Sequence, residues 1–326
     1  MILSLENIKS ITKGALAVRE ENGWLRFDRF SSEQKSVYEE ACEKFFIRTA
    51  ATASICLDLV TDAESITLDY EMGRLNMIAP DFMFFDVWED GIMTAHLGRA
   101  TREKFAECLS IPLSCGEKRV RIYFPNLFDM SIRSIELNGA SFFRAVEGSR
   151  KALILGDSIT QGFDAHHPSL SYANTIIRNF NLDAVNQAIG GEVFRPAMLG
   201  SRPLFNPEII TVAYGTNDWA SGGVSTSAAR EFFRRLTELY PAARIFYISP
   251  IWRTNAEQLV EGVSFYETTQ TLKSIAKEAG ATVIDGDKIM HKLPEMYDDG
   301  LHPNDLGFSQ YAKVLTEQLI ENGVNL

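Results

Sequence analysis

The sequence predicts a protein of two domains, an N-terminal all-β sandwich of jelly-roll type and a C-terminal three-layer α/β/α domain with a parallel sheet. Three observations support this prediction. The chain has 326 residues, which is more than one hydrophobic core usually holds. Short alternating runs precede residue 145, and strand-like runs alternate with amphipathic helices after residue 150. A polar link at 147–151 places the boundary, which gives domains over 1–148 and 149–326.

The strands of the N-terminal half are predicted by a period of two. Apolar and polar residues alternate over 66–70 and over 120–124, which is typical of a strand with one buried face. Asp90-Gly91 and Asn138-Gly139 stand beside such runs and suit tight hairpin turns, where positive φ angles are needed. Between about residues 24 and 145, helical spacing is scarce apart from the stretch near residues 34–44. Many short strands with turn signals favour a sandwich.

The strands of the C-terminal half are predicted by short runs that are apolar on both faces. Such runs indicate strands buried between two helix layers, as in a parallel sheet. They are, in chain order, Ala152–Leu155, Ala184–Ile189, Ile209–Ala213, Ile245–Ile248 and Thr282–Ile284. Three stretches among and after these runs place their apolar side chains on one helical face, at 232–239, 272–279 and 308–319.

Composition and charge exclude several classes of protein. Hydrophobic residues make up 45% and charged residues 23%, as in an ordinary globular protein. A net charge of -11 would repel a nucleic-acid backbone or an anionic bilayer, so neither is expected as a partner. No run reaches the roughly 18 apolar residues of a membrane span.

The N-terminus does not resemble a targeting segment. Glu6, Lys9 and Lys13 interrupt it, so no signal peptide is expected and a cytoplasmic location is predicted. The oligomeric state stays open.

The cysteines give no sign of a metal site. The four residues Cys42, Cys56, Cys108 and Cys115 lack CxxC spacing, and all lie in the first half of the chain. They are expected to be reduced, buried thiols. Neither a metal nor another cofactor is predicted for this protein.

Polar residues with catalytic potential follow the predicted strands. Gly156–Ser158, Gly190–Gly191 and Gly215–Asp218 come after the first three runs, and Asp298–His302 precedes the last helix. Ligands of parallel sheets bind beyond the carboxyl ends of the strands, where these segments should meet. They supply a hydroxyl, backbone donors, a side-chain amide and an Asp/His pair, which are the parts of an acyl-transfer site.

The same segments carry a family resemblance. G-D-S-I at 156–159, the glycine pair at 190–191, G-T-N-D at 215–218 and D-G-L-H at 299–302 resemble, in order and spacing, the four motifs of the SGNH (GDSL-like lipase/acylhydrolase) hydrolases. The resemblance covers just over half of the chain. It implies a flavodoxin-like parallel sheet and a serine esterase that needs no cofactor. Ile159 stands where the family usually has leucine, which is a like-for-like change.

The chemistry of these residues suggests a role for each one. Ser158 would attack an ester carbonyl, His302 would take its proton, and Asp299 would orient the imidazole. Backbone N–H groups of Ser158 and Gly191 and the side-chain amide of Asn217 would hold the oxyanion.

Several assignments remain open at this stage. Asp298 is an alternative orienting carboxylate, and Gly190 is an alternative oxyanion donor. Asp157 is expected to hold the nucleophile loop by hydrogen bonds. His96 and His291 are expected at the surface.

Candidate substrate-binding residues follow other strand ends. Trp219 and Trp252 would stack on a sugar ring or acyl chain, or else pack in the core. His166, next to His167, would line the pocket or lie in an exposed loop. Asp285 and Asp287 imitate a metal-binding pattern but lack further ligands at a sensible spacing, so a turn is expected.

The predicted reaction is hydrolysis of short acyl esters, acetyl above all, on a carbohydrate or another small molecule. The substrate class follows only from the resemblance of the two-domain build to bacterial carbohydrate esterases. Alternatives are a thioesterase or lysophospholipase-type acylhydrolase, and a non-catalytic carbohydrate-binding protein. The sandwich domain either binds glycan or only forms one side of the cleft.

Overall fold

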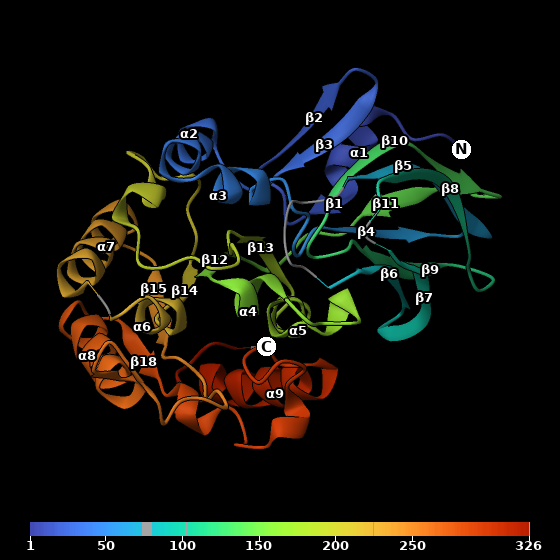
Figure 1. The fold of residues 1–326 in the computed structure, drawn as a ribbon. Helices are drawn as coiled ribbons and strands as arrows, with labels where there is room; N and C mark the ends of the chain where they lie inside the picture. Colours follow the sequence, from blue (N-terminus) through green and yellow to red (C-terminus); the bar gives the residue numbers. More distant parts are fainter. Residues whose placement is uncertain (74–79, 102, 224, 326) are drawn as a thin grey trace.

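A computed structural model describes residues 1–73, 80–101, 103–223 and 225–325 of the chain. Antiparallel sheets make up most of the N-terminal half, and one parallel sheet with its helices makes up the C-terminal half (Figure 1). The predicted fold class is therefore confirmed.

Two antiparallel sheets pack face to face in the N-terminal half. The first has the order β1 (Thr12–Lys13), β4 (Cys56–Thr61), β9 (Lys118–Tyr123), β6 (Phe82–Glu89) and β7 (Ile92–Ala100), with β11 (Phe143–Ala145) paired to β4. The second has the order β2 (Ala17–Glu21), β3 (Trp24–Asp28), β10 (Asp129–Asn138), β5 (Ser65–Gly73) and β8 (Phe105–Pro112). Their inner faces and helix α1 (Leu5–Ile11) share one apolar core.

Local sequence explains the strand pattern and the hairpin turns. Along β5 every second residue is buried, as the alternation predicts. Asp90 and Gly91 have φ angles of 47° and 86° and connect β6 to β7, so the predicted tight turn is confirmed. Gly139, with φ 73°, follows β10 directly.

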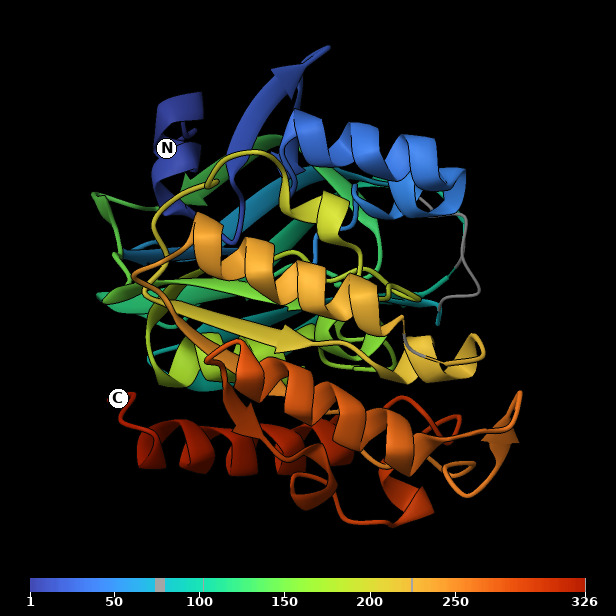
Figure 2. The same cartoon turned by 90° about the vertical axis from the view of Figure 1, so that its left-hand side faces the viewer.

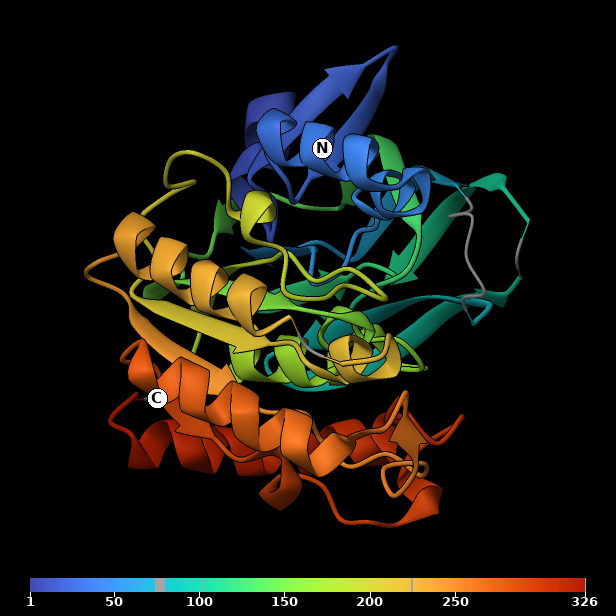
Figure 3. The ribbon, with the colours of Figure 1, turned by 60° about the vertical axis from the view of Figure 1, so that its left-hand side comes forward.

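The parallel sheet has the order β13 (Leu182–Asn186), β12 (Arg150–Gly156), β14 (Ile209–Ala213), β15 (Arg244–Ile248) and β18 (Thr282–Ile284). Helices α5 (Tyr172–Asn179) and α9 (Asp305–Glu321) cover one face, while α7 (Thr226–Leu239) and α8 (Phe265–Glu278) cover the other (Figures 2 and 3). The strands bury side chains toward both layers, which explains why their sequences are continuously apolar.

Short elements lie at the ends of the strands. They are α4 (Ser158–Gln161), η1 (Pro168–Leu170), η2 (Pro196–Leu199), α6 (Thr216–Ala220), η3 (Gly286–Lys288), η4 (Pro294–Met296) and the hairpin of β16 (Leu259–Val260) and β17 (Val263–Ser264). Two of them, α4 and α6, start within the segments that the sequence analysis singled out.

Two helices of the N-terminal half pack against the α/β half. Helix α2 (Ser32–Ala41) begins at a capping box between Ser31 and Gln34, and α3 (Glu43–Arg48) follows it. Tyr38 is fully buried in the core that α7 shares with the parallel sheet. Gln34 Nε2 donates to Gln187 Oε1 over 2.9 Å. The domain boundary stays a prediction, and side chains from before it contribute to the packing of the second half.

The prediction of buried cysteines is wrong for three of the four residues. All four are free thiols, but only Cys56 is buried. Cys108 lies at an outward-facing position of β8, because exposed and partly buried residues alternate along this strand. Cys42 caps the end of α2, and Cys115 lies in the loop after β8. Among the described residues, no helix is both long and apolar enough to cross a bilayer.

Candidate active site

Ser158 lies at the carboxyl end of β12, where the strand turns into α4. Asp157 caps this helix, since its Oδ1 accepts a hydrogen bond from the N–H of Ile159 over 3.0 Å. The expected structural role of Asp157 is thus confirmed. Gly156 allows the sharp turn, because a Cβ there would lie 2.1 Å from Thr160 Oγ1. As the first residue of the helix, Ser158 has a backbone N–H with no partner inside the helix.

Three polar side chains form a continuous line that starts at Ser158. The Ser158 Oγ lies 2.8 Å from His302 Nε2, although 144 residues separate them in the chain. The His302 Nδ1 lies 2.7 Å from Asp299 Oδ2. The other carboxylate oxygen, Asp299 Oδ1, accepts bonds from the backbone N–H groups of Leu301 and His302 over 2.9 and 2.8 Å. These backbone bonds hold the carboxylate against the ring.

The electrostatics of the two candidate carboxylates differ. Burial alone would raise the pKa of Asp299, but its hydrogen bonds with His302 outweigh burial and hold that pKa well below the usual range. Asp299 is therefore ionised at neutral pH. Asp298, the alternative orienting residue, instead lies 3.2 Å from His166 Nε2 through its Oδ2. The geometry favours Asp299 as the partner of His302.

A second carboxylate, which the sequence analysis missed, also faces His302. Asp164 Oδ2 lies 3.8 Å from His302 Nδ1 and is buried. Burial, together with the charges of Asp299 and Asp298, raises the pKa of Asp164 to about 7. The preceding residue, Phe163, packs its ring on the imidazole with centroids 4.3 Å apart. No motif marks either position in the sequence.

The glycine pair after β13 has two different environments. The N–H of Gly190 donates to Gln161 Oε1 over 2.8 Å, and its carbonyl accepts a bond from Arg48. Gly191 is exposed, has φ 84°, and donates its N–H to no acceptor within the described part of the chain. Of the two candidates, Gly191 is the one whose N–H is free to bind an oxyanion.

Asn217 lies at the start of α6, beyond the end of β14. Its Nδ2 donates to the carbonyl of Glu192 over 3.1 Å, which leaves the second amide hydrogen for a ligand. Glu192 directly follows Gly191, so this bond ties the amide to the glycine turn.

The N-terminal half contributes side chains to this region. Arg48, at the end of α3, is buried and donates to the carbonyl of Gly190. A Cβ on Gly191 would lie 3.3 Å from Arg48 Nη1 and 3.8 Å from the Phe45 ring. Phe82 of β6 packs on His166 with centroids 3.9 Å apart. These residues lie far from every motif, so only the tertiary structure reveals them.

The predicted substrate-binding roles agree with the structure to different degrees. Trp219 is fully buried, donates its indole N–H to the carbonyl of Val263 over 3.0 Å and packs on Phe265. A ring with no exposed face cannot stack on a ligand, so the core alternative replaces the predicted role. Trp252 is half-buried and contacts Tyr297, while His166 is exposed. Binding roles for these two residues stay predictions.

His96, which was expected at the surface, is half-buried, with 27% of its side chain exposed. Its Nδ1 lies 2.7 Å from the fully buried Asp86, and its ring packs on that of His167 at 4.0 Å. Strand pairing between β6 and β7 places His96 and Asp86 opposite each other. His291 is exposed as expected.

Two clusters in the described chain could offer metal ligands. They are Asp86, His96, His167 and Asp164, Asp299, His302. In both, histidine and aspartate already pair with one another. Asp285 and Asp287 instead bind Lys273 and Lys292 over 3.0 and 2.8 Å, and η3 begins between them, which confirms the expected turn.

Solved structures similar to this chain share the fold along most of its length. "Salicylyl-Acyltransferase SsfX3 from a Tetracycline Biosynthetic Pathway" has a TM-score of 0.77 at 19% identity, covering 96% of this chain and 94% of its own. A family two carbohydrate esterase from Clostridium thermocellum in complex with cellohexaose has a TM-score of 0.64 at 16% identity, covering 84% and 94%. An acetyl xylan esterase from Butyrivibrio proteoclasticus has a TM-score of 0.59 at 18% identity, covering 82% and 89%.

A family match identifies the C-terminal half. No curated protein sequence is a match for this chain. Residues 154–309 match the sequence model of the GDSL-like Lipase/Acylhydrolase family, a range that contains Ser158, the glycine pair, Asn217 and His302. The chain thus carries a GDSL-like lipase/acylhydrolase domain of the SGNH type and is a serine ester hydrolase.

Proposed function

We propose that this protein removes short acyl groups, acetyl above all, from a carbohydrate through an acyl-enzyme on Ser158. The observation that carries the mechanism is the line from Ser158 Oγ to His302 Nε2 at 2.8 Å and from His302 Nδ1 to Asp299 Oδ2 at 2.7 Å. A serine hydroxyl is a weak nucleophile until a base within hydrogen-bond distance takes its proton.

The proposed reaction has two acyl-transfer steps. Ser158 Oγ attacks the ester carbonyl carbon while His302 Nε2 takes the hydroxyl proton, and Asp299 stabilises the resulting imidazolium. The tetrahedral intermediate collapses, the ester C–O bond breaks, and His302 returns the proton to the leaving alcohol. Water then repeats the sequence on the acyl-serine and releases the carboxylic acid and free Ser158.

The oxyanion of each tetrahedral intermediate needs donors placed beforehand. The N–H groups of Ser158 and Gly191 and the Nδ2 of Asn217 are proposed for this role. The N–H of Gly191 has no described acceptor, and Asn217 keeps one amide hydrogen free. A donor of this kind typically contributes about a hundredfold or more to the rate.

The assignment of a carbohydrate as the substrate rests on likeness of fold, whereas the assignment of the catalytic residues rests on geometry. The similar structures named as a family two carbohydrate esterase and an acetyl xylan esterase have the same two-part fold, and likeness of fold is a weak argument for a shared substrate. Phe45 and Phe82 from the N-terminal half stand near the site, which favours a role for this half in forming the cleft.

Other reactions share the same nucleophile. A thioesterase or lysophospholipase-type enzyme would prefer longer acyl groups. Transfer of the acyl group to a hydroxyl acceptor in place of water is a further candidate, because the similar structure named a salicylyl-acyltransferase covers 96% of this chain. The third alternative, a non-catalytic carbohydrate-binding protein, is disfavoured by the short distances among Ser158, His302 and Asp299.

The test is hydrolysis of p-nitrophenyl acetate, butyrate and octanoate and of acetylated xylo-oligosaccharides by wild type and by Ser158→Ala. We expect the acetyl substrates to be fastest and the variant to lose at least about a thousandfold in kcat. Ser110→Ala, on an exposed position of β8, is the matched control. Equal rates in wild type and Ser158→Ala would refute the nucleophile, and a preference for octanoate would favour the longer-acyl alternative.

A separate measurement tests the acyl-transfer alternative. Adding an alcohol acceptor such as glycerol and measuring the ratio of new ester to free acid separates the two fates of the acyl-enzyme. Ester formation that dominates at low acceptor concentration would identify a transferase.

A further inference from the structure

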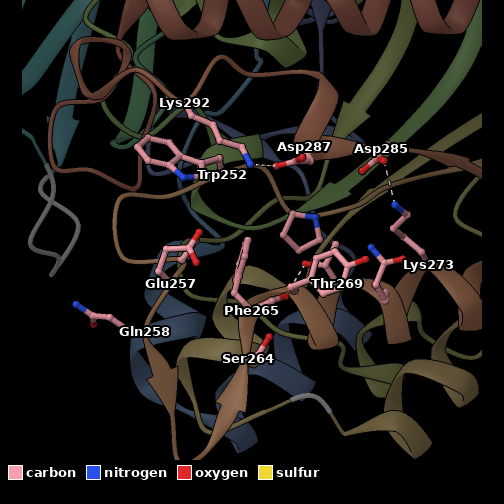
Figure 4. Close-up of a pocket in the computed structure, with 14 residues that line it drawn as sticks. Trp252, Glu257, Gln258, Ser264, Phe265, Thr269, Lys273, Asp285, Asp287 and Lys292 are labelled. Carbon is pink, nitrogen blue, oxygen red and sulfur yellow. Dashed lines mark hydrogen bonds and ion pairs between the residues drawn. The ribbon is translucent and has the colours of Figure 1, made fainter.

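A cavity of about 460 Å³ opens beside the loop that follows β15, away from Ser158. Its walls come from this loop, from the start of α8 and from the segment after β18. Figure 4 shows Trp252, Glu257 and Phe265 around one end and Lys273 and Asp285 at the other. None of Ser158, Asp299 and His302 lines it, so this space is distinct from the proposed catalytic centre. Its size is in the range of small-ligand sites.

The loop that forms one wall also contacts the candidate active site. Arg253 Nη1 donates to Thr216 Oγ1 over 3.1 Å, and Thr216 directly precedes Asn217. The N–H of Thr254 donates to the carbonyl of Gly300, between Asp299 and His302, over 2.8 Å. Trp252, one residue before Arg253, lines the cavity. A ligand in the cavity would therefore contact the loop that touches both catalytic segments.

Aromatic rings supply the apolar part of the cavity wall. Trp252 is half-buried and is held at its edge by Tyr297, with centroids 5.5 Å apart. Within the described residues, its indole N–H has no acceptor, although it is not sealed from solvent. Tyr266 is 70% exposed at the rim, an unusual exposure for a large aromatic side chain. Such rings offer flat apolar faces beside polar donors.

The charged side chains of the cavity exclude an anionic ligand. Lys273 and Lys292 are each paired, with Asp285 and Asp287, over 3.0 and 2.8 Å (Figure 4). Glu257 adds a third carboxylate to the lining, so the carboxylates outnumber the lysines. A phosphate or carboxylate ligand would find no unpaired cation here. An acyl chain would be equally disfavoured, because it would leave the polar groups unsatisfied.

We propose that this cavity is a binding site for a neutral sugar unit of the acylated carbohydrate, other than the unit that carries the ester. A sugar ring combines an apolar face, which the rings of Trp252 and Tyr266 can cover, with hydroxyl groups that the carboxylates, Gln258 and Gln270 can bind. This inference rests on the proposed carbohydrate substrate. It predicts that the enzyme recognises an oligosaccharide rather than an isolated monosaccharide ester.

The test measures binding of unacetylated xylotriose and cellotriose by isothermal titration calorimetry and saturation-transfer NMR. The proteins are wild type, Ser158→Ala, Tyr266→Ala and Trp252→Ala. We expect binding to wild type and to Ser158→Ala, and at least tenfold weaker binding to Tyr266→Ala and Trp252→Ala. Because Tyr266 is mostly exposed, its variant should fold even if Trp252→Ala does not. Ile92→Ala, at an exposed hairpin turn of the sandwich, is the matched control.

The outcomes separate this inference from the proposed function. Undiminished trisaccharide binding by Tyr266→Ala and Trp252→Ala, or no binding to wild type, would overturn the sugar site. The nucleophile is tested independently by loss of p-nitrophenyl acetate hydrolysis in Ser158→Ala. A second readout is KM for acetylated xylobiose and xylotriose, which should rise in Tyr266→Ala with little change in kcat.

Discussion

Asp164 Oδ2 lies 3.8 Å from His302 Nδ1, the same ring nitrogen that lies 2.7 Å from Asp299. Two carboxylates thus face one imidazole. They differ in charge below pH 7, since the pKa of Asp164 is raised to about 7 by burial and by neighbouring acids, while hydrogen bonds from His302 keep the pKa of Asp299 low. Asp164 therefore adds a second titrating carboxylate beside His302.

The first prediction concerns the pH dependence of Asp164→Asn. Below pH 7 Asp164 is protonated and uncharged, and above pH 7 it is ionised and stabilises the imidazolium formed in the transition state. The variant should therefore lose about tenfold in kcat/KM at pH 8.5, with a much smaller loss at pH 6. The measurement is kcat/KM for p-nitrophenyl acetate from pH 5 to 9. A loss of equal size at every pH would show that Asp164 acts only by packing.

The second prediction separates the two neighbouring acids of the D-D-G-L-H segment. Asp299→Asn should lower kcat by about 10²- to 10⁴-fold, because an amide favours the wrong tautomer of His302. Asp298→Asn should have a small effect, since Asp298 contacts His166. The comparison is made by steady-state kinetics at pH 8 on both variants. A larger loss in Asp298→Asn would reverse the assignment.

The third prediction tests the oxyanion role of Asn217. Asn217→Ala should reduce kcat by about 10²- to 10³-fold with little change in KM, because the donor acts on charge that develops in the transition state. Asn179→Ala, on the exposed face of α5, is the control. A change confined to KM would assign Asn217 to ground-state binding instead.

The fourth prediction tests whether the N-terminal half shapes the site. Arg48→Met removes the donor that holds the Gly190 carbonyl and keeps much of the apolar stem. We expect about a tenfold lower kcat, because the N–H of Gly191 would lose its position. Arg133→Met, on the exposed face of β10, is the matched control. Unchanged kinetics in Arg48→Met would limit the sandwich to a packing role.

The fifth prediction concerns stability at Asp157, whose pKa burial raises to about 7. Between about pH 4 and 7 the folded protein keeps a proton there that the unfolded chain releases, so the free energy of unfolding falls as pH rises. Asp157→Asn keeps an acceptor for Ile159 and removes this dependence. Its free energy of unfolding relative to wild type should increase from pH 5 to 7, by at most about 1.4 kcal/mol per pH unit, and its Tm relative to wild type should increase with it.

The control for Asp157 is Asp28→Asn. Burial opposes ionisation of Asp28, but hydrogen bonds from Arg19 and Lys35 outweigh it and lower its pKa. Asp28 is therefore ionised in both states above pH 5, and its variant should differ from wild type by a constant amount. The checks are thermal melts at several pH values. A constant difference for Asp157→Asn as well would contradict the predicted titration.

Much of the fold could be predicted from the sequence, because local patterns determine it. The five apolar runs became the strands of the parallel sheet, and the alternating runs became sandwich strands. Ser158, Asn217 and His302 could be named because each stands in a short motif at a strand or helix end, where a parallel sheet brings ligand-binding residues together.

Other parts of the molecule were decided only by tertiary structure. Trp219 follows a strand end just as Trp252 does, but α8 and the segment around Val263 cover the first, while the second borders a cavity. Arg48 and Asp164 carry no motif and reach the site through packing between segments far apart in the chain. The physical reason is that periodicity reports which face of an element is buried, whereas the partner on that face depends on long-range contacts that no local pattern encodes.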